Sequence, residues 1–348
     1  MRNLLKKYHA LTAQGLSNRA MARLLNLPKS TVQGHLRKIR LTGNLGHGNI
    51  GRQNRKPNPN KAAIIATAAK YYDFNISHAR EMLESRDGII VNRETLRRWL
   101  GRPKKHKRPK QRQRRESKPN FGELLQIDGS FHDWFGGVKT CMINIVDDAT
   151  RITEIHLDAQ ETIESACYAA WRWFMAYGVP RAFYADGRNM YHVLEGSKTN
   201  FFKAMCHNLG IRVIMARRAQ AKGRVERYNG VHQDRLVPLM RLDGVRELSD
   251  ANKYLEEYIV EHNRRFSHPA KEGNVHTSLP SGIESIDDVC FILIERTLNN
   301  DWTFSYEGKT YQIPRQSDYP PAKSKIQVKI TISGHITAYY RWTDFIVQ

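Results

Sequence analysis

The sequence predicts a multidomain chain with an all-α N-terminal region, a central α/β domain built on a mixed five-stranded sheet, and a small all-β C-terminal domain. Three observations support this. Short helical segments occur in two sets within the first hundred residues, strands and then helix–strand alternation fill residues 121–265, and apolar and polar residues alternate over residues 301–348. The length of 348 residues also favours more than one domain.

Positive charge is concentrated in the N-terminal third. The chain has 56 Lys and Arg against 34 Asp and Glu, a formal net charge of +22. Residues 1–120 hold 29 of the basic residues and only 6 acidic ones, whereas residues 121–348 hold 27 and 28. An unpartnered basic region of this size with helical patterning predicts binding to a polyanion, and nucleic acid is favoured over an anionic membrane.

Residues 1–45 predict a helix-turn-helix module of three short helices. Apolar residues recur at helical spacing in the first helix, Ser17 is placed to cap a second helix over residues 18–26, and Ser30 to cap a third that runs to about residue 40. In this layout the last helix enters the major groove, although a helical hairpin with a solvated basic face is the alternative. The polar face of that helix offers side chains that can reach bases and phosphates, namely Thr31, Gln33, Arg37 and Lys38.

Residues 61–101 repeat this layout after a linker at residues 46–60. A helix is predicted over residues 61–72, a second with Ser77 as its cap, and a third over residues 93–100 with Asn92 as its cap. The last helix exposes three candidate DNA contacts, Arg93, Arg97 and Arg98.

Residues 102–120 form a second, strongly basic linker. Its composition cannot build a core, so we expect it to follow phosphate groups. The contacts expected from it are Lys104, Lys105, Lys107 and Arg108.

The central region, residues 121–265, predicts a sheet flanked by helices. Its five strands are expected at residues 124–127, 141–146, 151–157, 181–185 and 211–216. Its helices are expected at residues 161–177, 197–209, 222–240 and 250–265. Because three strands come first and helix–strand alternation follows, the sheet should be mixed.

The remaining sequence predicts a connector at residues 266–300 and a small β-barrel at residues 301–348, with a β-sandwich as the alternative. Four scattered cysteines without a CxxC pair predict neither a zinc site nor a disulfide framework, as expected in a reducing cytosol. No apolar run is long enough to span a bilayer, and the N-terminus has no signal-like segment.

Three acidic residues lie where the predicted fold could bring them together. Asp128 follows an apolar strand in LLQIDGS, Asp186 follows another in RAFYADG, and Glu226 lies on a predicted helix in AKGRVERYNG. Carboxylates are the ligands that hard divalent ions prefer, and two such ions can promote an in-line phosphoryl displacement. From the residues alone, Asp-Gly turns and an exposed helical charge remain an open alternative.

The phrases QIDGS, VDDAT, FYADG and KGRVERYNG resemble the DDE transposases of bacterial insertion sequences, most closely the ISNCY-type group, which are relatives of retroviral integrases. The resemblance covers most of the chain and is strongest over residues 121–265, and the phrase around Glu226 is its most specific element. It implies a ribonuclease-H-like catalytic core. Asp128 would lie on the first, central strand, Asp186 after the fourth strand, and Glu226 on the helix after the fifth.

The resemblance also implies the chemistry. Asp128, Asp186 and Glu226 would hold two Mg²⁺ (or Mn²⁺) ions per active site, and no ATP is needed. Helix-turn-helix units replace the His/Cys zinc module of retroviral integrases, so no zinc is expected. Water would cleave each transposon end, and the freed 3′-hydroxyl would then attack target DNA. Pairing of the ends implies a homodimer or larger synaptic complex on double-stranded DNA, in the bacterial cytoplasm at the nucleoid and without a membrane partner.

Residues near the three carboxylates are auxiliary candidates. His132 and Asp133 follow the first aspartate and could meet DNA or a metal ligand, although such residues more often close a hairpin. Asp148, at the end of the second strand, could lie near the metal ions or cap a turn. Three basic residues around Glu226 are expected to contact DNA, with a solvated helix face as the alternative: Lys222, Arg224 and Arg227.

Two other functions remain open from the sequence. A non-catalytic, sequence-specific DNA-binding regulator with a decayed core should have lost a member of the triad, and all three are present. A structure-specific nuclease on the same core would not need tandem modules for recognising a DNA end.

Overall fold

The computed structural model describes residues 2–43, 45, 58–103, 116–135, 137, 139–186, 200–216, 223–321, 323–341 and 343–347. The chain divides into two compact units, Met1–Ile64 and Ile65–Gln348. Five of the predicted DNA contacts lie outside the described residues, namely Lys104, Lys105, Lys107, Arg108 and Lys222.

The first unit contains a three-helix module, α1 (Arg2–Ala13), α2 (Asn18–Leu25) and α3 (Lys29–Thr42). Ser17 caps α2 as predicted, because its hydroxyl accepts a hydrogen bond from the Ala20 N–H. The cap predicted for α3 is wrong. That helix begins before Ser30, and Pro28 stands at its cap position without a side-chain acceptor. The core of the module is closed by Tyr8, Met21 and Val32.

The second helical module consists of α4 (Lys61–Ala68), a short 3₁₀ turn (Ala69–Tyr71), α5 (Ile76–Asp87) and α6 (Arg93–Trp99). Asn92 caps α6 as predicted. The cap predicted for the preceding helix is wrong, because α5 begins two residues earlier than expected. The Asn75 side chain accepts from the His78 N–H at 2.9 Å, and the Ser77 hydroxyl instead accepts from Arg93 Nε at 2.8 Å.

The central sheet has five strands in the order β3-β2-β1-β4-β5. Their bounds are β1 (Leu125–Asp133), β2 (Lys139–Asp147), β3 (Thr153–Asp158), β4 (Ala182–Asp186) and β5 (Arg212–Ala216). The first three strands pair antiparallel, while β4 pairs parallel with β1 and with β5. The mixed five-stranded sheet expected from the sequence is therefore confirmed.

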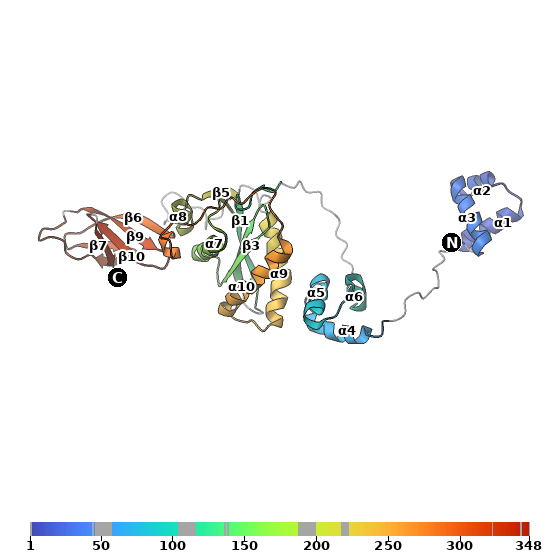
Figure 1. Ribbon diagram of the computed structural model, residues 1–348, viewed down its shortest axis with the longest axis horizontal. Helices are drawn as coiled ribbons and strands as arrows, with labels where there is room; N and C mark the ends of the chain where they lie inside the picture. The colour runs from blue at the N-terminus through green and yellow to red at the C-terminus, as the bar shows by residue number, and fades with distance from the viewer. Residues whose placement is uncertain are drawn as a thin grey trace. The chain divides into compact units, whose positions relative to one another are not determined.

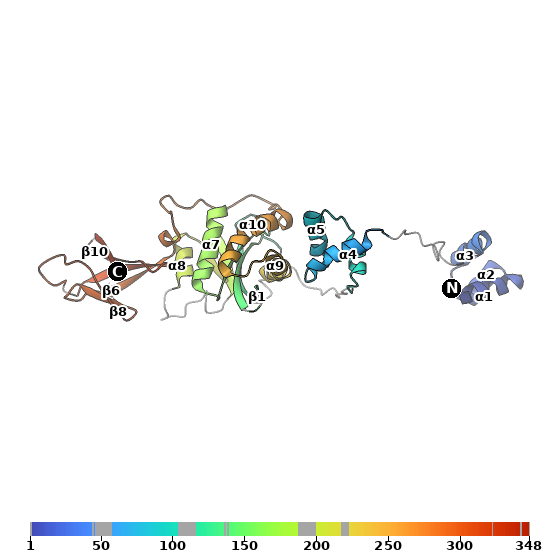
Figure 2. The same cartoon turned by 90° about the horizontal axis from the view of Figure 1, so that it is seen from below.

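Helices cover both faces of this sheet (Figure 1). They are α7 (Ile163–Tyr177), α8 (Phe201–Asn208), α9 (Gly223–Leu242) and α10 (Leu248–Phe266). Figure 2 shows α7 and α8 on one side of the strands and α9 and α10 on the other. Side chains of β2 alternate between the two cores: Ile143 packs with Trp173 of α7, and Met142 packs with Leu236 of α9.

Ion pairs join the second helical module to the C-terminal end of α9. Arg86 makes two hydrogen bonds to Asp243, at 2.5 and 2.8 Å, and Arg241 makes two to Asp73, both at 2.7 Å. Leu239 packs against the apolar core of the module. The pairing runs both ways, because Arg86 of the module pairs with an aspartate of the central domain and Asp73 of the module pairs with an arginine of α9.

The C-terminal part is all-β, as predicted. A four-stranded sheet has the order β11-β10-β9-β6, with β6 (Phe291–Thr297), β9 (Lys325–Thr331), β10 (Ile336–Tyr340) and β11 (Thr343–Val347). A separate hairpin consists of β7 (Thr303–Tyr306) and β8 (Lys309–Gln312). Strand β6 lies within the predicted connector, and neither it nor β11 was expected from the sequence. Across the described residues, no helix is both long and apolar enough to cross a bilayer.

Candidate active site

Asp128 lies inside the central strand and not after its end. Strand β1 continues to Asp133, and Asp128 stands opposite Asn144 of β2. On the other side, Gln126 is level with Tyr184 of β4, so two residues further along both strands Asp128 and Asp186 reach the same level. The pairing of β1 with β4 ends at Gln126 and Tyr184, so the two predicted aspartates lie on neighbouring strands, two residues beyond the last paired residues.

Glu226 lies in the first turn of α9, and its side chain is exposed. Helix α9 meets β1 through three hydrogen bonds. The Val225 N–H donates to Gln126 Oε1 at 3.3 Å, Asn229 Nδ2 donates to Asp128 Oδ2 at 3.0 Å, and Gln233 Nε2 donates to the Ser130 hydroxyl at 2.9 Å. We call these six residues the polar seam: Gln126, Asp128, Ser130, Val225, Asn229 and Gln233.

The polar seam stays in register because helix and strand advance by similar distances. Two residues of a strand span about 6.7 Å, and four residues of a helix rise about 6.0 Å. Every second residue of β1 therefore meets every fourth residue of α9. Glu226 and Asn229, three residues apart, are neighbours on the helix surface. Because Asn229 bonds to Asp128, Glu226 lies about one helical turn before a residue that contacts that aspartate.

The donor chemistry of this region fits a hard divalent cation. Asp128 and Glu226 supply carboxylate oxygens, and the Asp186 backbone is adjacent, although its side chain lies outside the described residues. Among the side chains that the structure describes, no group of three His, Cys, Asp or Glu residues is close enough to hold a metal ion. The described part of the site thus contributes two of the three predicted ligands.

The two aspartates of VDDAT make internal contacts. Asp147 accepts hydrogen bonds from the backbone of Gly122, Ala149 and Thr150, and burial raises the pKa of its carboxyl above the ordinary value. The Asp148 side chain is fully buried and pairs with the Arg224 guanidinium.

Asp148 also accepts from Gln126 Nε2 and from the Lys118 N–H, both at 2.8 Å. Arg224 Nη2 donates to the Ser117 hydroxyl at 3.2 Å. The contacts of Asp148 and Arg224 hold the start of α9 against β1, next to Glu226.

Three other residues predicted near the triad, His132, Asp133 and Arg227, contact close neighbours in the chain or face solvent. His132 packs edge-on against Trp134, with 5.3 Å between ring centroids. Both carboxylate oxygens of Asp133 accept from the Gly137 N–H, a contact typical of a hairpin turn. Arg227 is exposed on α9. Direct roles for these residues at the site stay predictions.

The predicted DNA contacts of the helical modules are distributed over two helices. On α3, Gln33 and Arg37 are exposed, while Thr31 and Lys38 are half-buried. On α6, Arg93 and Arg98 are exposed, and Arg97 pairs with Glu94 at 2.7 Å. These assignments also stay predictions.

The sequence analysis missed the amides that contact the first carboxylate. Asn229 bonds to Asp128 directly, and Asn144 bonds to Asn229. A signal was present: Gln126, Asp128 and Ser130 are polar residues at alternate positions of a strand whose other positions are largely apolar, which indicates a polar partner on that face.

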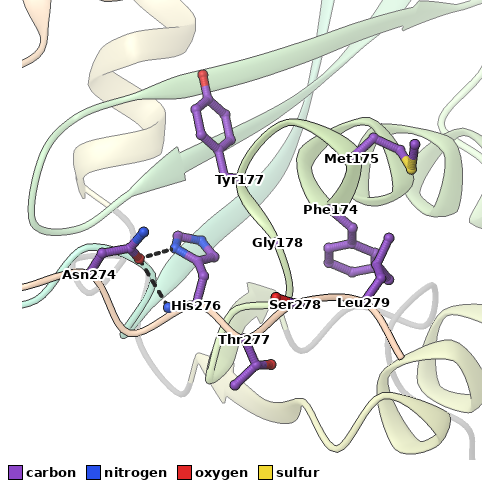
Figure 3. A pocket seen from close by; sticks show the side chains of 9 residues that line it. All are labelled: Phe174, Met175, Tyr177, Gly178, Asn274, His276, Thr277, Ser278 and Leu279. Atoms are coloured by element: carbon purple, nitrogen blue, oxygen red, sulfur yellow. Dashed lines mark hydrogen bonds between the residues drawn. The ribbon is translucent and has the colours of Figure 1, made fainter. Parts of the chain in front are cut away.

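A pocket lies between the end of α7 and the segment from Asn274 to Leu279 (Figure 3). Its volume is about 410 Å³. Its His276 ring hydrogen-bonds to Asn274 and accepts from Trp173 Nε1 at 3.0 Å, and burial lowers the His276 pKa to about 4. The lining contains no carboxylate, so this pocket is not the predicted metal site.

Comparison with known proteins confirms the resemblance to insertion-sequence transposases. No protein-family model matches the chain. The protein y4bF of Sinorhizobium fredii, named as a transposase, is 33% identical over 317 residues, or 84% of this chain and 66% of that protein. The chain thus spans just under two thirds of that relative. The transposase for insertion sequence IS1202 of Streptococcus pneumoniae is 28% identical over 96% of this chain and 83% of that protein.

Solved structures of integrases are also similar. The HTLV-2 integrase catalytic core domain in complex with magnesium has a TM-score of 0.32 and 18% identity, covering 39% of this chain and 83% of that one. A chain of the simian T-cell lymphotropic virus intasome in complex with PP2A regulatory subunit B56 gamma has a TM-score of 0.38 and 14% identity, covering 81% of this chain and 95% of that one.

Proposed function

We propose that this relative of insertion-sequence transposases is itself a DNA transposase, which binds terminal inverted repeats, cleaves the 3′ ends and joins them to target DNA. One observation supports the proposal most: Asn229, three residues after Glu226 on α9, hydrogen-bonds to Asp128 of the central strand, and the Asp186 backbone is on the neighbouring strand. This is the order of carboxylates that the resemblance implied.

The residues would divide the work as follows. Asp128, Asp186 and Glu226 would hold Mg²⁺ or Mn²⁺, with two ions per site. When bound, the ions supply activation of an attacking oxygen and stabilisation of a leaving one. In the first step water attacks the phosphodiester, the bond to the 3′ oxygen breaks, and a 3′-hydroxyl is released. In the second step that hydroxyl attacks a target phosphodiester and displaces another 3′ oxygen.

The helical modules would recognise the DNA ends. Exposed basic and amide side chains on α3 and α6 suit contacts with phosphates and base edges, as in helix-turn-helix proteins. Two ends must meet before joining, so we expect a dimer or larger complex on DNA.

A labelled-oligonucleotide assay with Mg²⁺ or Mn²⁺ tests the proposal. The substrate is a duplex carrying the inverted repeat that flanks the coding sequence, with a scrambled duplex as control. A transposase gives end cleavage and strand transfer, a nuclease gives cleavage alone, and a regulator gives binding without reaction.

Substituting the second aspartate tests the metal site itself. Asp186→Asn should abolish both steps and leave end binding intact, because it removes a ligand and no DNA contact. If the purified Asp186→Asn protein still joined ends in Mg²⁺, the assignment would be wrong.

A further inference from the structure

A chain of side-chain hydrogen bonds crosses the sheet and ends on Asp128. The Thr153 hydroxyl of β3 donates to Asn144 Oδ1 of β2 at 2.6 Å, and Asn144 Nδ2 donates to Asn229 Oδ1 of α9 at 2.9 Å. Asn229 Nδ2 then donates to Asp128 Oδ2 at 3.0 Å. Thr153 and Asn144 are fully buried, and Asn229 is 7% exposed. We call these four residues the amide relay.

The direction of the amide relay follows from the carboxylate at its end. An ionised carboxylate can only accept hydrogen bonds, so Asn229 must turn its NH₂ group toward Asp128. Its oxygen then faces Asn144, which must present its own NH₂ group. The oxygen of Asn144 is left for the Thr153 hydroxyl. The amides of Asn144 and Asn229 therefore each have one favourable orientation, because flipping either one would place two oxygens or two NH₂ groups opposite each other.

The amide relay reaches Asp128 from the helix that carries Glu226. Asn229 is on the same surface of α9 as Glu226, and it reaches Asp128 because the polar seam keeps α9 in register with β1. A change at Asn229 therefore alters the hydrogen bonding of Asp128 without touching Glu226. Gln233, one helical turn further on, makes a comparable amide contact to β1, but its partner is the Ser130 hydroxyl and not a carboxylate.

We propose that Asn229, oriented by Asn144 and Thr153, is a positioning residue that fixes the Asp128 carboxylate for binding a divalent cation. The inference rests on the proposed function, because it takes Asp128 as a metal ligand. Groups that hydrogen-bond to metal ligands orient them, and their loss weakens metal binding. Asn229 thus acts on the metal site through Asp128 without itself being a ligand.

Mn²⁺ binding to the full chain provides the test. The probe is Mn²⁺ alone, and electron paramagnetic resonance measures the free ion during titration of wild type, Asn229→Leu and Gln233→Leu. Asn229→Leu should weaken Mn²⁺ binding about 10-fold or more, whereas Gln233→Leu should change it less than about twofold. Thermal melting of each protein confirms folding, and Asn229→Ala replaces Asn229→Leu if the latter is unfolded at the assay temperature.

Asn144→Leu tests the remainder of the relay. It leaves Asn229 in place but removes the group that orients its amide, so Mn²⁺ binding should also weaken, by a smaller factor than in Asn229→Leu. Equal losses in Asn229→Leu and Gln233→Leu would mean that the amides only seat the helix, and would overturn the proposal.

Asp128→Asn distinguishes failure of the proposed metal site from failure of the role inferred for Asn229. If Asp128→Asn leaves Mn²⁺ binding unchanged, the metal site of the proposed function is refuted and the inference falls with it. If Asp128→Asn weakens Mn²⁺ binding while Asn229→Leu has no effect, only the inference is refuted.

Discussion

Arg224 was expected to contact DNA, yet it is the partner of a buried carboxylate. The Asp148 side chain has no exposed surface, and 17% of the Arg224 side chain is exposed. Arg224→Met removes the guanidinium and keeps most of the side-chain volume, so Asp148 would stay buried without its cation. Removing one partner of a buried ion pair costs about 3–5 kcal/mol.

The contacts that remain place the loss at the lower end of this range. Asp148 would still accept from Gln126 Nε2 and from the Lys118 N–H. We therefore expect Arg224→Met to lower the free energy of unfolding by about 3 kcal/mol, which for a domain of this size lowers Tm by about 6–12 °C. Thermal melting followed by circular dichroism measures this shift.

Two variants complete this experiment. Arg227→Met, at an exposed position three residues along α9, should leave Tm unchanged. Combining Arg224→Met with Asp148→Asn should recover part of the lost Tm, because no uncompensated charge is then buried. The reasoning would be refuted if Arg224→Met melted like the wild type while binding DNA more weakly, since Arg224 would then serve DNA and not Asp148.

Three further predictions concern pH, backbone strain and salt. Burial lowers the pKa of His78 from 6.5 to about 3, so the neutral buried ring stabilises the folded state fully above pH 6.5, and this stabilisation is lost as the pH falls toward 3. His78→Leu should therefore flatten the dependence of Tm on pH over that window. An unchanged slope would contradict this. Gly122 has φ +80°, and a Cβ added there would lie 2.4 Å from the His276 ring, whereas Gly210 has φ +69° and open space around it. Gly122→Ala should therefore lower Tm more than Gly210→Ala does. Equal decreases in Tm would exclude the ring contact as a cause. DNA affinity of the full chain should fall with salt, and Arg37→Ala should reduce the log–log slope by about 0.9 if Arg37 neutralises one phosphate, whereas an unaltered slope would remove it from the interface.

Local features were predictable from the sequence, and features that depend on distant pairing were not. The Ser17 and Asn92 caps are decided by a few neighbouring residues and were predicted correctly. Ser77 failed because Asn75, two residues earlier, competes for the same role. Strand β6 was missed because its apolar run FILI does not alternate, and because it pairs with β9, whose residues come 28 to 40 positions later.

The same distinction applies to the candidate site. The order of Asp128, Asp186 and Glu226 along strand, strand and helix was predictable because each lies in a recognisable local phrase. Asn229 and Asn144 have no such phrase, since their contact depends on the register of β1, β2 and α9 together. Basic residues near Glu226 predicted DNA contact, but sequence proximity could not indicate that Arg224 pairs with a carboxylate 76 positions earlier.

The register between α9 and β1 restricts how the length of this segment can change during evolution. Each helical residue turns the chain by about 100°, so one inserted or deleted residue between Glu226 and Asn229 would rotate Glu226 away from the strand while Asn229 stayed on Asp128. An insertion of four residues would nearly restore the rotation, but it would move Glu226 about 6 Å along the helix axis. Substitutions at the exposed Arg227 can therefore be tolerated where a change in length cannot, and the spacing of three residues is itself a requirement of the site.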